Sequence, residues 1–175
     1  SEYDFVILID ASGSMANSSK RYPGKTRWEE VRETAIGIAG EISKFDDNGI
    51  DVVVFGSTVE MFADCNSDKV SSVFNSRSPR GGTPLAEALQ KVVEKQRSTN
   101  KNTIAICFTD GEPNDKEMVA KTIISATKLL PKDEALTFLF VQVGDDPGAE
   151  RFLAFLDEGL PGAKFDIIDA ISAKE

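Results

Sequence analysis

Short, nearly continuous apolar segments alternate along this chain with longer amphipathic segments, and this alternation constrains the fold most. A short apolar run is typical of a strand that is buried on both faces of a sheet. Apolar residues at steps of three and four predict a helix with one buried face. Strands that alternate with helices predict an α/β fold with a mostly parallel sheet. The predicted strands are Tyr3–Ile9, Ile50–Phe55, Val59–Phe62, Thr103–Thr109, Leu136–Val143 and Phe165–Ile168.

Helices are predicted between these strands. The first has one apolar face and is closed by the turn at residues 47–49; that face consists of Trp28, Val31, Ala35, Ile38, Ile42 and Phe45. The other predicted helices are residues 70–74, one begun by Pro84, one that runs from an Asp115 cap to Leu130, residues 147–156, and a last one that starts at Ala170 and is cut off by the end of the chain.

The order of the strands follows from their connections. Only residues 56–58 separate the second strand from the third, so the two form a hairpin and the third strand is an antiparallel edge. Right-handed crossovers limit the other choices, and the simplest is a doubly wound six-stranded sheet of order 3-2-1-4-5-6 with helices on both faces. The first and fourth strands are then neighbours, and a ligand site is expected between their carboxyl ends. Those ends are Asp10 and Asp110.

Length and composition fit one globular domain over residues 1–175, and no repeat or linker divides it. The formal net charge of −9 disfavours nucleic-acid binding through a basic face. The chain has no histidine, which removes the commonest general base and the commonest transition-metal ligand. Its two cysteines predict neither a zinc site nor a disulfide framework, and no apolar segment is long enough for membrane insertion.

Hydroxyl and carboxylate side chains gather where the predicted sheet binds ligands. Asp10, Ser12 and Ser14 directly follow the first strand, and a curled loop can turn both hydroxyls toward one point. Thr83 adds a third hydroxyl from a loop that contains two glycines, and Asp110 adds a second carboxylate. Hard oxygens of this kind suit Mg²⁺, Ca²⁺ or Mn²⁺.

Each of these residues also has an ordinary structural interpretation. Serine and aspartate after a strand often make turns or cap helices without binding anything. For Thr83, capping the helix that Pro84 begins is an equal contender, and both roles can coexist. Only the joint pattern of five residues predicts a metal site.

The pattern Asp-x-Ser-x-Ser, followed by a distant Thr and a distant Asp, resembles the metal-ion-dependent adhesion site of von Willebrand factor A domains. The resemblance covers nearly the whole chain, and the segment at residues 27–29 resembles the first helix of bacterial members. It implies that Ser12, Ser14 and Thr83 contact one divalent cation through their hydroxyls. It implies that Asp10 and Asp110 act directly or through water, and that an Asp or Glu of a partner protein completes the coordination.

Four further residues are expected around the rim of this site, where they would contribute to partner selection: Glu112, Arg80, Arg21 and Tyr22. The simpler interpretation, solvated loop residues with scattered charges, fits each of them equally well.

The predicted function is a metal-dependent protein-binding module without catalytic residues, with Mg²⁺ as the first choice and Ca²⁺ or Mn²⁺ as alternatives. We expect a monomeric domain within a larger protein or complex, used in extracellular adhesion or in assembly inside the cell. The lack of disulfides favours the cytoplasm. The alternative is a Mg²⁺-dependent phosphohydrolase on a similar sheet. Such enzymes need an acid/base carboxylate two residues after the first aspartate, where this chain has Ser12.

Overall fold

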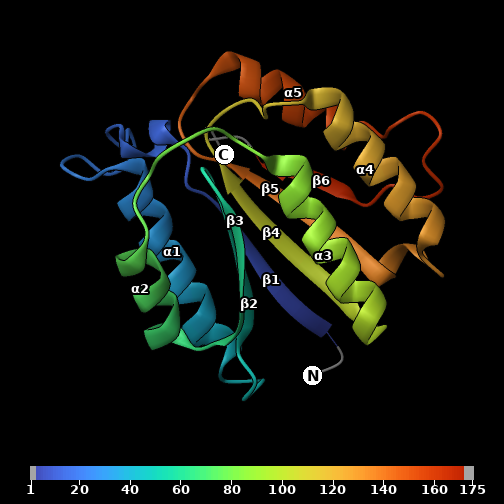
Figure 1. The fold of residues 1–175 in the computed structure, drawn as a ribbon, viewed down its shortest axis with the longest axis horizontal. Helices are drawn as coiled ribbons and strands as arrows, with labels where there is room; N and C mark the ends of the chain where they lie inside the picture. The colour runs from blue at the N-terminus through green and yellow to red at the C-terminus, as the bar shows by residue number, and fades with distance from the viewer. Residues whose placement is uncertain (1–2, 172–175) are drawn as a thin grey trace.

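The computed structural model describes residues 3–171 and has the predicted sheet (Figure 1). Its six strands lie in the order β3-β2-β1-β4-β5-β6, and every pair is parallel except β2 with β3. Both the strand order and the antiparallel edge are therefore confirmed. The strands are β1 (Tyr3–Asp10), β2 (Ile50–Phe55), β3 (Val59–Cys65), β4 (Asn102–Thr109), β5 (Leu136–Gln142) and β6 (Ile168–Ile171).

Helices cover both faces of the sheet, and α1 and α2 lie on the opposite side from α3 and α4 (Figure 1). The helices are α1 (Arg27–Ile42), α2 (Ser67–Ser76), α3 (Leu85–Thr99), α4 (Lys116–Leu129) and α5 (Pro147–Asp157), with 3₁₀ turns η1 (Gly13–Ala16) and η2 (Asp133–Ala135). Within residues 3–171, no helix has the length and apolar character that crossing a membrane requires.

Two apolar cores flank the sheet, and the alternation of side chains along β1 divides its residues between them. Val6 and Leu8 pack with apolar residues of α3, α4 and α5, while Ile7 and Ile9 pack with those of α1 and α2. Because all four side chains are buried, β1 is held on both faces up to the residue before Asp10. The aspartate is therefore fixed at the carboxyl end of a central strand.

Side-chain caps set where several helices begin. The Thr26 hydroxyl accepts the backbone N–H of Glu29, and the Glu29 carboxylate accepts the backbone N–H of Thr26, so α1 starts with a capping box. The predicted cap of α4 is confirmed, because the Asp115 carboxylate accepts the N–H of Met118 at 3.0 Å. Pro84 lies at the N-cap of α3, one residue before the position predicted for it.

The end of the chain differs from the prediction. The last strand is Ile168–Ile171, three residues later than predicted, and its first residue pairs with Phe138. The prediction starts the strand at Phe165 because this residue is apolar. In the structure Phe165 lies in a loop, partly buried against the core. The helix predicted from Ala170 is wrong for the residues that belong to β6, and its remainder lies outside the described residues.

Phe45 is the other misplaced residue. The helix α1 ends at Ile42, and a turn in which Ile42 accepts the N–H of Phe45 carries the chain away from the apolar face. The Phe45 residue is 82% exposed, so it does not belong to the core.

Candidate metal centre

Asp10 and Asp110 lie side by side because β1 and β4 are parallel neighbours. Ile9 pairs with Phe108, so the residues that follow both strands reach the same edge of the sheet. The two aspartates are 0% and 2% exposed. Two buried carboxylates at one strand edge are costly unless each has hydrogen-bond donors or a positive charge close by.

The carboxylate of Asp10 accepts hydrogen bonds from neutral donors. Its Oδ1 accepts the backbone N–H of Ser12 at 2.8 Å, and its Oδ2 accepts the hydroxyl of Thr109 at 2.8 Å and the backbone N–H of Asp110 at 3.4 Å. Thr109 is a contact that the sequence analysis missed. The available signal was its position at the end of β4, directly before Asp110.

Burial and charge make the ionised form of Asp10 unfavourable. Burial, together with the nearby negative charge of Asp110, raises the pKa of Asp10 from 3.8 to about 6, although the hydrogen bonds from Ser12 and Thr109 oppose the rise. A cation placed between the two carboxylates would remove this penalty, since it stabilises both ionised groups.

The loop after β1 curls its hydroxyls toward Asp110. Ser12 and Ser14 have their Oγ atoms 3.2 Å apart, and the Ser14 hydroxyl donates to Asp110 Oδ1 at 2.9 Å. The 3₁₀ turn η1 provides the curl, and the fully buried side chain of Met15 anchors it in the core. Four of the five predicted residues thus form one hydrogen-bonded cluster.

Thr83 lies in the neighbouring loop, and Asn114 fixes its backbone. The Thr83 N–H donates to Asn114 Oδ1 at 2.8 Å, and the Thr83 carbonyl accepts the Asn114 N–H at 3.0 Å. Thr83 is a buried residue, and within residues 3–171 no side-chain hydrogen bond caps α3, so Thr83 does not have the capping role that was its alternative interpretation.

A glycine lets this loop approach the strand edge. Gly81 has a φ of +86°, and a Cβ there would lie 2.6 Å from the Cα of Ser57. Its carbonyl accepts the N–H of Gly13 at 3.1 Å, which joins the Thr83 loop to the Ser12–Ser14 loop. Another side chain at position 81 would force the Thr83 loop away from Ser57 in the turn between β2 and β3.

Arg27, the first residue of α1, is a second contact that the sequence analysis missed. Its Nη1 donates to Asp110 Oδ2 at 2.9 Å, which makes an ion pair with a carboxylate that is itself fully buried. Each oxygen of Asp110 therefore accepts one donor, Ser14 on Oδ1 and Arg27 on Oδ2. No sequence pattern pairs these residues, because they are 83 positions apart.

The predicted rim residues lie at different distances from the cluster. The Arg80 N–H donates to the carbonyl of Ala11, so this residue borders the loop after β1. Glu112 follows Asp110 closely and forms an ion pair with Lys116 at 2.6 Å.

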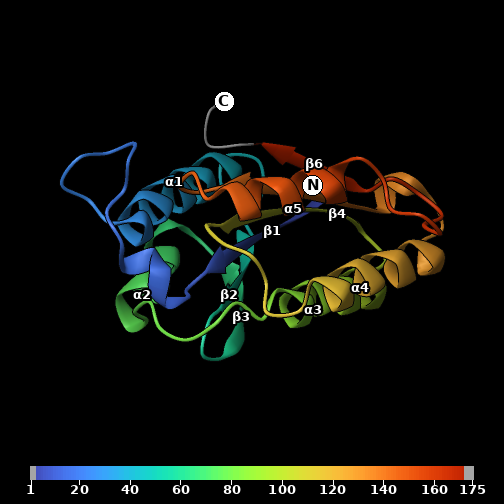
Figure 2. The same ribbon diagram turned by 90° about the horizontal axis from the view of Figure 1, so that it is seen from above.

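Arg21 and Tyr22 belong to a separate loop. Their segment protrudes from the body of the molecule before α1 (Figure 2). The Arg21 guanidinium lies 5.6 Å from the centre of the Tyr22 ring. In the part of the chain that the structure describes, no hydrogen bond or ion pair joins either side chain to the five predicted residues.

The donor set fits a hard divalent cation. It offers three hydroxyls and two carboxylates, and the described residues contain no cluster of three or more His, Cys, Asp or Glu side chains. A set so poor in nitrogen and sulfur disfavours zinc or copper. Oxygen donors that are partly neutral suit Mg²⁺, Ca²⁺ or Mn²⁺ with water in the remaining positions.

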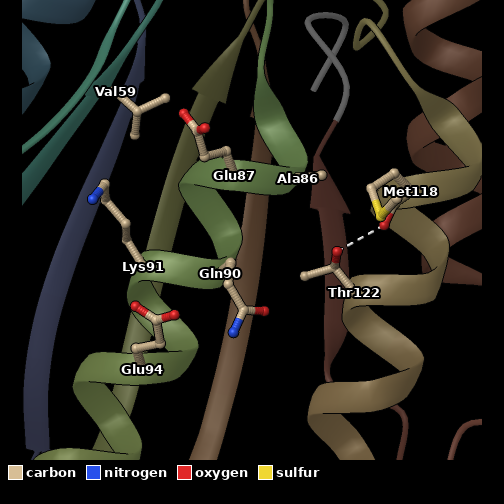
Figure 3. A pocket seen from close by; sticks show the side chains of 8 residues that line it. All are labelled: Val59, Ala86, Glu87, Gln90, Lys91, Glu94, Met118 and Thr122. Carbon is tan, nitrogen blue, oxygen red and sulfur yellow. Dashed lines mark hydrogen bonds between the residues drawn. The ribbon is translucent and has the colours of Figure 1, made fainter.

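A groove on the flank of the molecule has different chemistry. It encloses about 630 Å³ along α3 and α4, with Val59 at its edge (Figure 3). Its polar side chains are of mixed charge, and it shares no residue with the predicted metal site.

Solved structures with the same fold come from several organisms. The manganese-loaded TRAP protein of Plasmodium vivax is similar with a TM-score of 0.68 and 17% identity, over 98% of this chain and 68% of that one. A mutant of the PilB minor pilin from Streptococcus sanguinis has a TM-score of 0.70 and 11% identity, over 99% and 57% of the two chains. A von Willebrand factor type A structure from Catenulispora acidiphila has a TM-score of 0.64 and 20% identity, over 98% of this chain and 39% of that one. The present chain thus spans little more than half of the pilin and less than half of the Catenulispora protein.

Sequence comparison identifies the family directly. The chain gives no match among curated proteins. The family model of the von Willebrand factor type A domain matches residues 5–112, which is more than half of the chain and includes most of β1, all of β4 and both buried aspartates. The chain therefore belongs to the von Willebrand factor type A domain family, whose members are protein-interaction and adhesion modules.

Proposed function

We propose that this domain binds one divalent cation, Mg²⁺ first among the candidates, and through it captures an acidic side chain of a partner protein. The hydroxyls of Ser12, Ser14 and Thr83 and the carboxylates of Asp10 and Asp110 would hold the cation. When bound, the cation supplies a positive centre that can accept one more oxygen ligand. The domain would act as one part of a larger protein or complex.

One observation carries the proposal: two carboxylates that are almost fully buried converge with serine hydroxyls at the carboxyl ends of β1 and β4. The Asp10 carboxylate has only neutral donors around it. Leaving it ionised without a positive charge is unfavourable, and the raised pKa expresses this cost. The manganese-loaded TRAP structure supports a divalent cation in a domain of this fold.

The site favours binding over hydrolysis. A phosphohydrolase on a similar sheet needs a carboxylate where Ser12 stands, and no described His, Cys, Asp or Glu joins the two aspartates to form a cluster of three. Without a residue placed for acid/base chemistry, the cation would serve as an anchor. The partner protein would compete only with water for the open position.

Calorimetric titration with Mg²⁺, Ca²⁺ and Mn²⁺ tests the proposal. Thr83→Ala should weaken binding of the preferred cation by at least about tenfold while the circular dichroism spectrum stays unchanged. Asp169→Asn is the matched control, since this exposed aspartate of β6 lies outside the cluster. Equal affinity in the two variants would reject the site. A robust Mg²⁺-dependent phosphatase activity that Asp10→Asn abolishes would reject the binding function.

A further inference from the structure

The buried charges at the candidate metal centre do not cancel. Asp10 and Asp110 contribute two negative charges, and Arg27 contributes one positive charge. Neighbouring charges are mostly paired elsewhere, because Lys20 pairs with Asp145 and Lys116 with Glu112. The exposed Arg80 adds a charge at the rim that water screens. Arg27 is therefore the positively charged side chain that acts most strongly on the two buried carboxylates.

The guanidinium of Arg27 is fixed in position. It packs on the backbone at Gly144, where an added Cβ would lie 2.9 Å from its Cζ. Its side chain is only 15% exposed, and within the described residues its buried Nε has no hydrogen-bond partner. A positive side chain in the first turn of a helix is also disfavoured by the helix dipole. These costs are offset mainly by the ion pair with Asp110, and the exposed carboxylate of Asp145 adds a weaker attraction.

When a divalent cation is bound, its two positive charges are balanced by the two carboxylates. The guanidinium of Arg27 then gives the loaded centre one positive charge in excess. We propose that this excess charge makes Arg27 the residue that selects an anionic ligand, a carboxylate rather than a neutral oxygen, for the open position of the metal. This inference rests on the proposed function. Arg27 opposes binding of the cation through like-charge repulsion and favours capture of the carboxylate that follows.

The two effects of Arg27 have opposite signs, and a purely structural role would not produce them. Arg27→Gln should raise Mn²⁺ affinity, on the order of tenfold, because the repulsion is lost. In the wild-type protein, acetate should raise the affinity for Mn²⁺, because the loaded centre carries an excess positive charge. Arg27→Gln should remove this effect of acetate, because the loaded centre of the variant is neutral. Arg27→Lys keeps the charge and should restore the effect of acetate.

The experiment follows free Mn²⁺ by electron paramagnetic resonance at constant ionic strength, in chloride, acetate or neutral acetamide. Arg32→Gln is the matched control, since Arg32 also lies on α1 and its buried Nε also has no hydrogen-bond partner among the described residues, but its Nη2 donates to the Ser71 hydroxyl. The control should behave as the wild-type protein does, and acetamide should change nothing.

The outcomes separate the two proposals. If the wild-type protein does not bind Mn²⁺, the proposed function fails. If it binds Mn²⁺ but acetate acts equally on the wild-type protein and Arg27→Gln, the selective role of Arg27 is overturned while the metal site stands. If Arg27→Gln and Arg27→Lys both lose Mn²⁺ affinity, Arg27 only supports the fold at Asp110, and the inference is again overturned.

Discussion

Replacing Asp10 by asparagine should make the metal-stripped protein more stable at neutral pH while it abolishes cation binding. The reason is that Asp10 has a pKa raised from 3.8 to about 6 by its burial and by the charge of Asp110. In the unfolded chain the carboxyl ionises near its ordinary value, so ionisation favours the unfolded state. Asparagine keeps nearly the same shape and carries no charge.

The size and sign of the effect follow from that pKa. The stabilisation that Asp10 gives the folded state is fully present below pH 4 and is lost as the pH rises through about 6. The free energy of unfolding falls by about 3 kcal/mol over this range. The amide cannot accept all three hydrogen bonds that the carboxylate accepts, and one mismatched donor costs about 1–2 kcal/mol. We therefore expect Asp10→Asn to be more stable than the wild-type protein by about 1–2 kcal/mol at pH 7.5, and less stable at pH 4.5.

Urea unfolding of both proteins in metal-stripped buffers at several pH values measures this difference. Using the difference between the proteins cancels the other carboxylates, such as Glu29 and Asp145, whose lowered pKa values act in the opposite direction. Saturating Mg²⁺ should reverse the order at pH 7.5, since only the wild-type protein binds it. A difference that does not change between pH 4.5 and 7.5 would refute the reasoning.

Three further predictions test the surroundings of the site. Gly81→Ala should destabilise the protein by about 1–3 kcal/mol in urea unfolding, because residue 81 has a positive φ and its Cβ would overlap Ser57. Asn114→Ala should lower cation affinity in calorimetry by about tenfold with little change in melting temperature, because the N–H of Thr83 loses the side-chain oxygen that accepts it, although the backbone N–H of residue 114 still donates to the Thr83 carbonyl; an unchanged affinity would contradict this role. Phe45→Ser should change the free energy of unfolding by less than about 0.5 kcal/mol, because Phe45 lies outside the core, and a larger loss would show that it packs.

Local patterns were enough to predict the architecture. The three-residue link between β2 and β3 requires a hairpin, and right-handed crossovers order the other strands. The same patterns gave wrong element boundaries where a single apolar side chain next to a strand or helix was assigned to it. Phe165 packs on the core from a loop and Phe45 lies beyond the end of α1, so neither follows the periodicity around it.

The candidate site was only partly accessible to the same reasoning. Asp10, Ser12 and Ser14 are close in sequence, and the strand order brings Asp110 to them. The ion pair of Arg27 with Asp110 depends on where α1 packs, and no local pattern encodes that.

Several predictions from the sequence stay predictions: the extent of the domain over residues 1–175, the bacterial source, the cytoplasmic location and the metal-binding roles of individual residues. The first three concern the rest of the protein and its host, which the fold does not determine. The last depends on where a cation binds and is open to direct measurement.

Crystals grown with Mn²⁺ give the most direct test of the central claim. An anomalous difference map recorded at the manganese absorption edge should show one peak enclosed by the hydroxyls of Ser12, Ser14 and Thr83 and next to the carboxylates of Asp10 and Asp110. A peak at another place on the molecule, or none there at saturating Mn²⁺, would contradict the account.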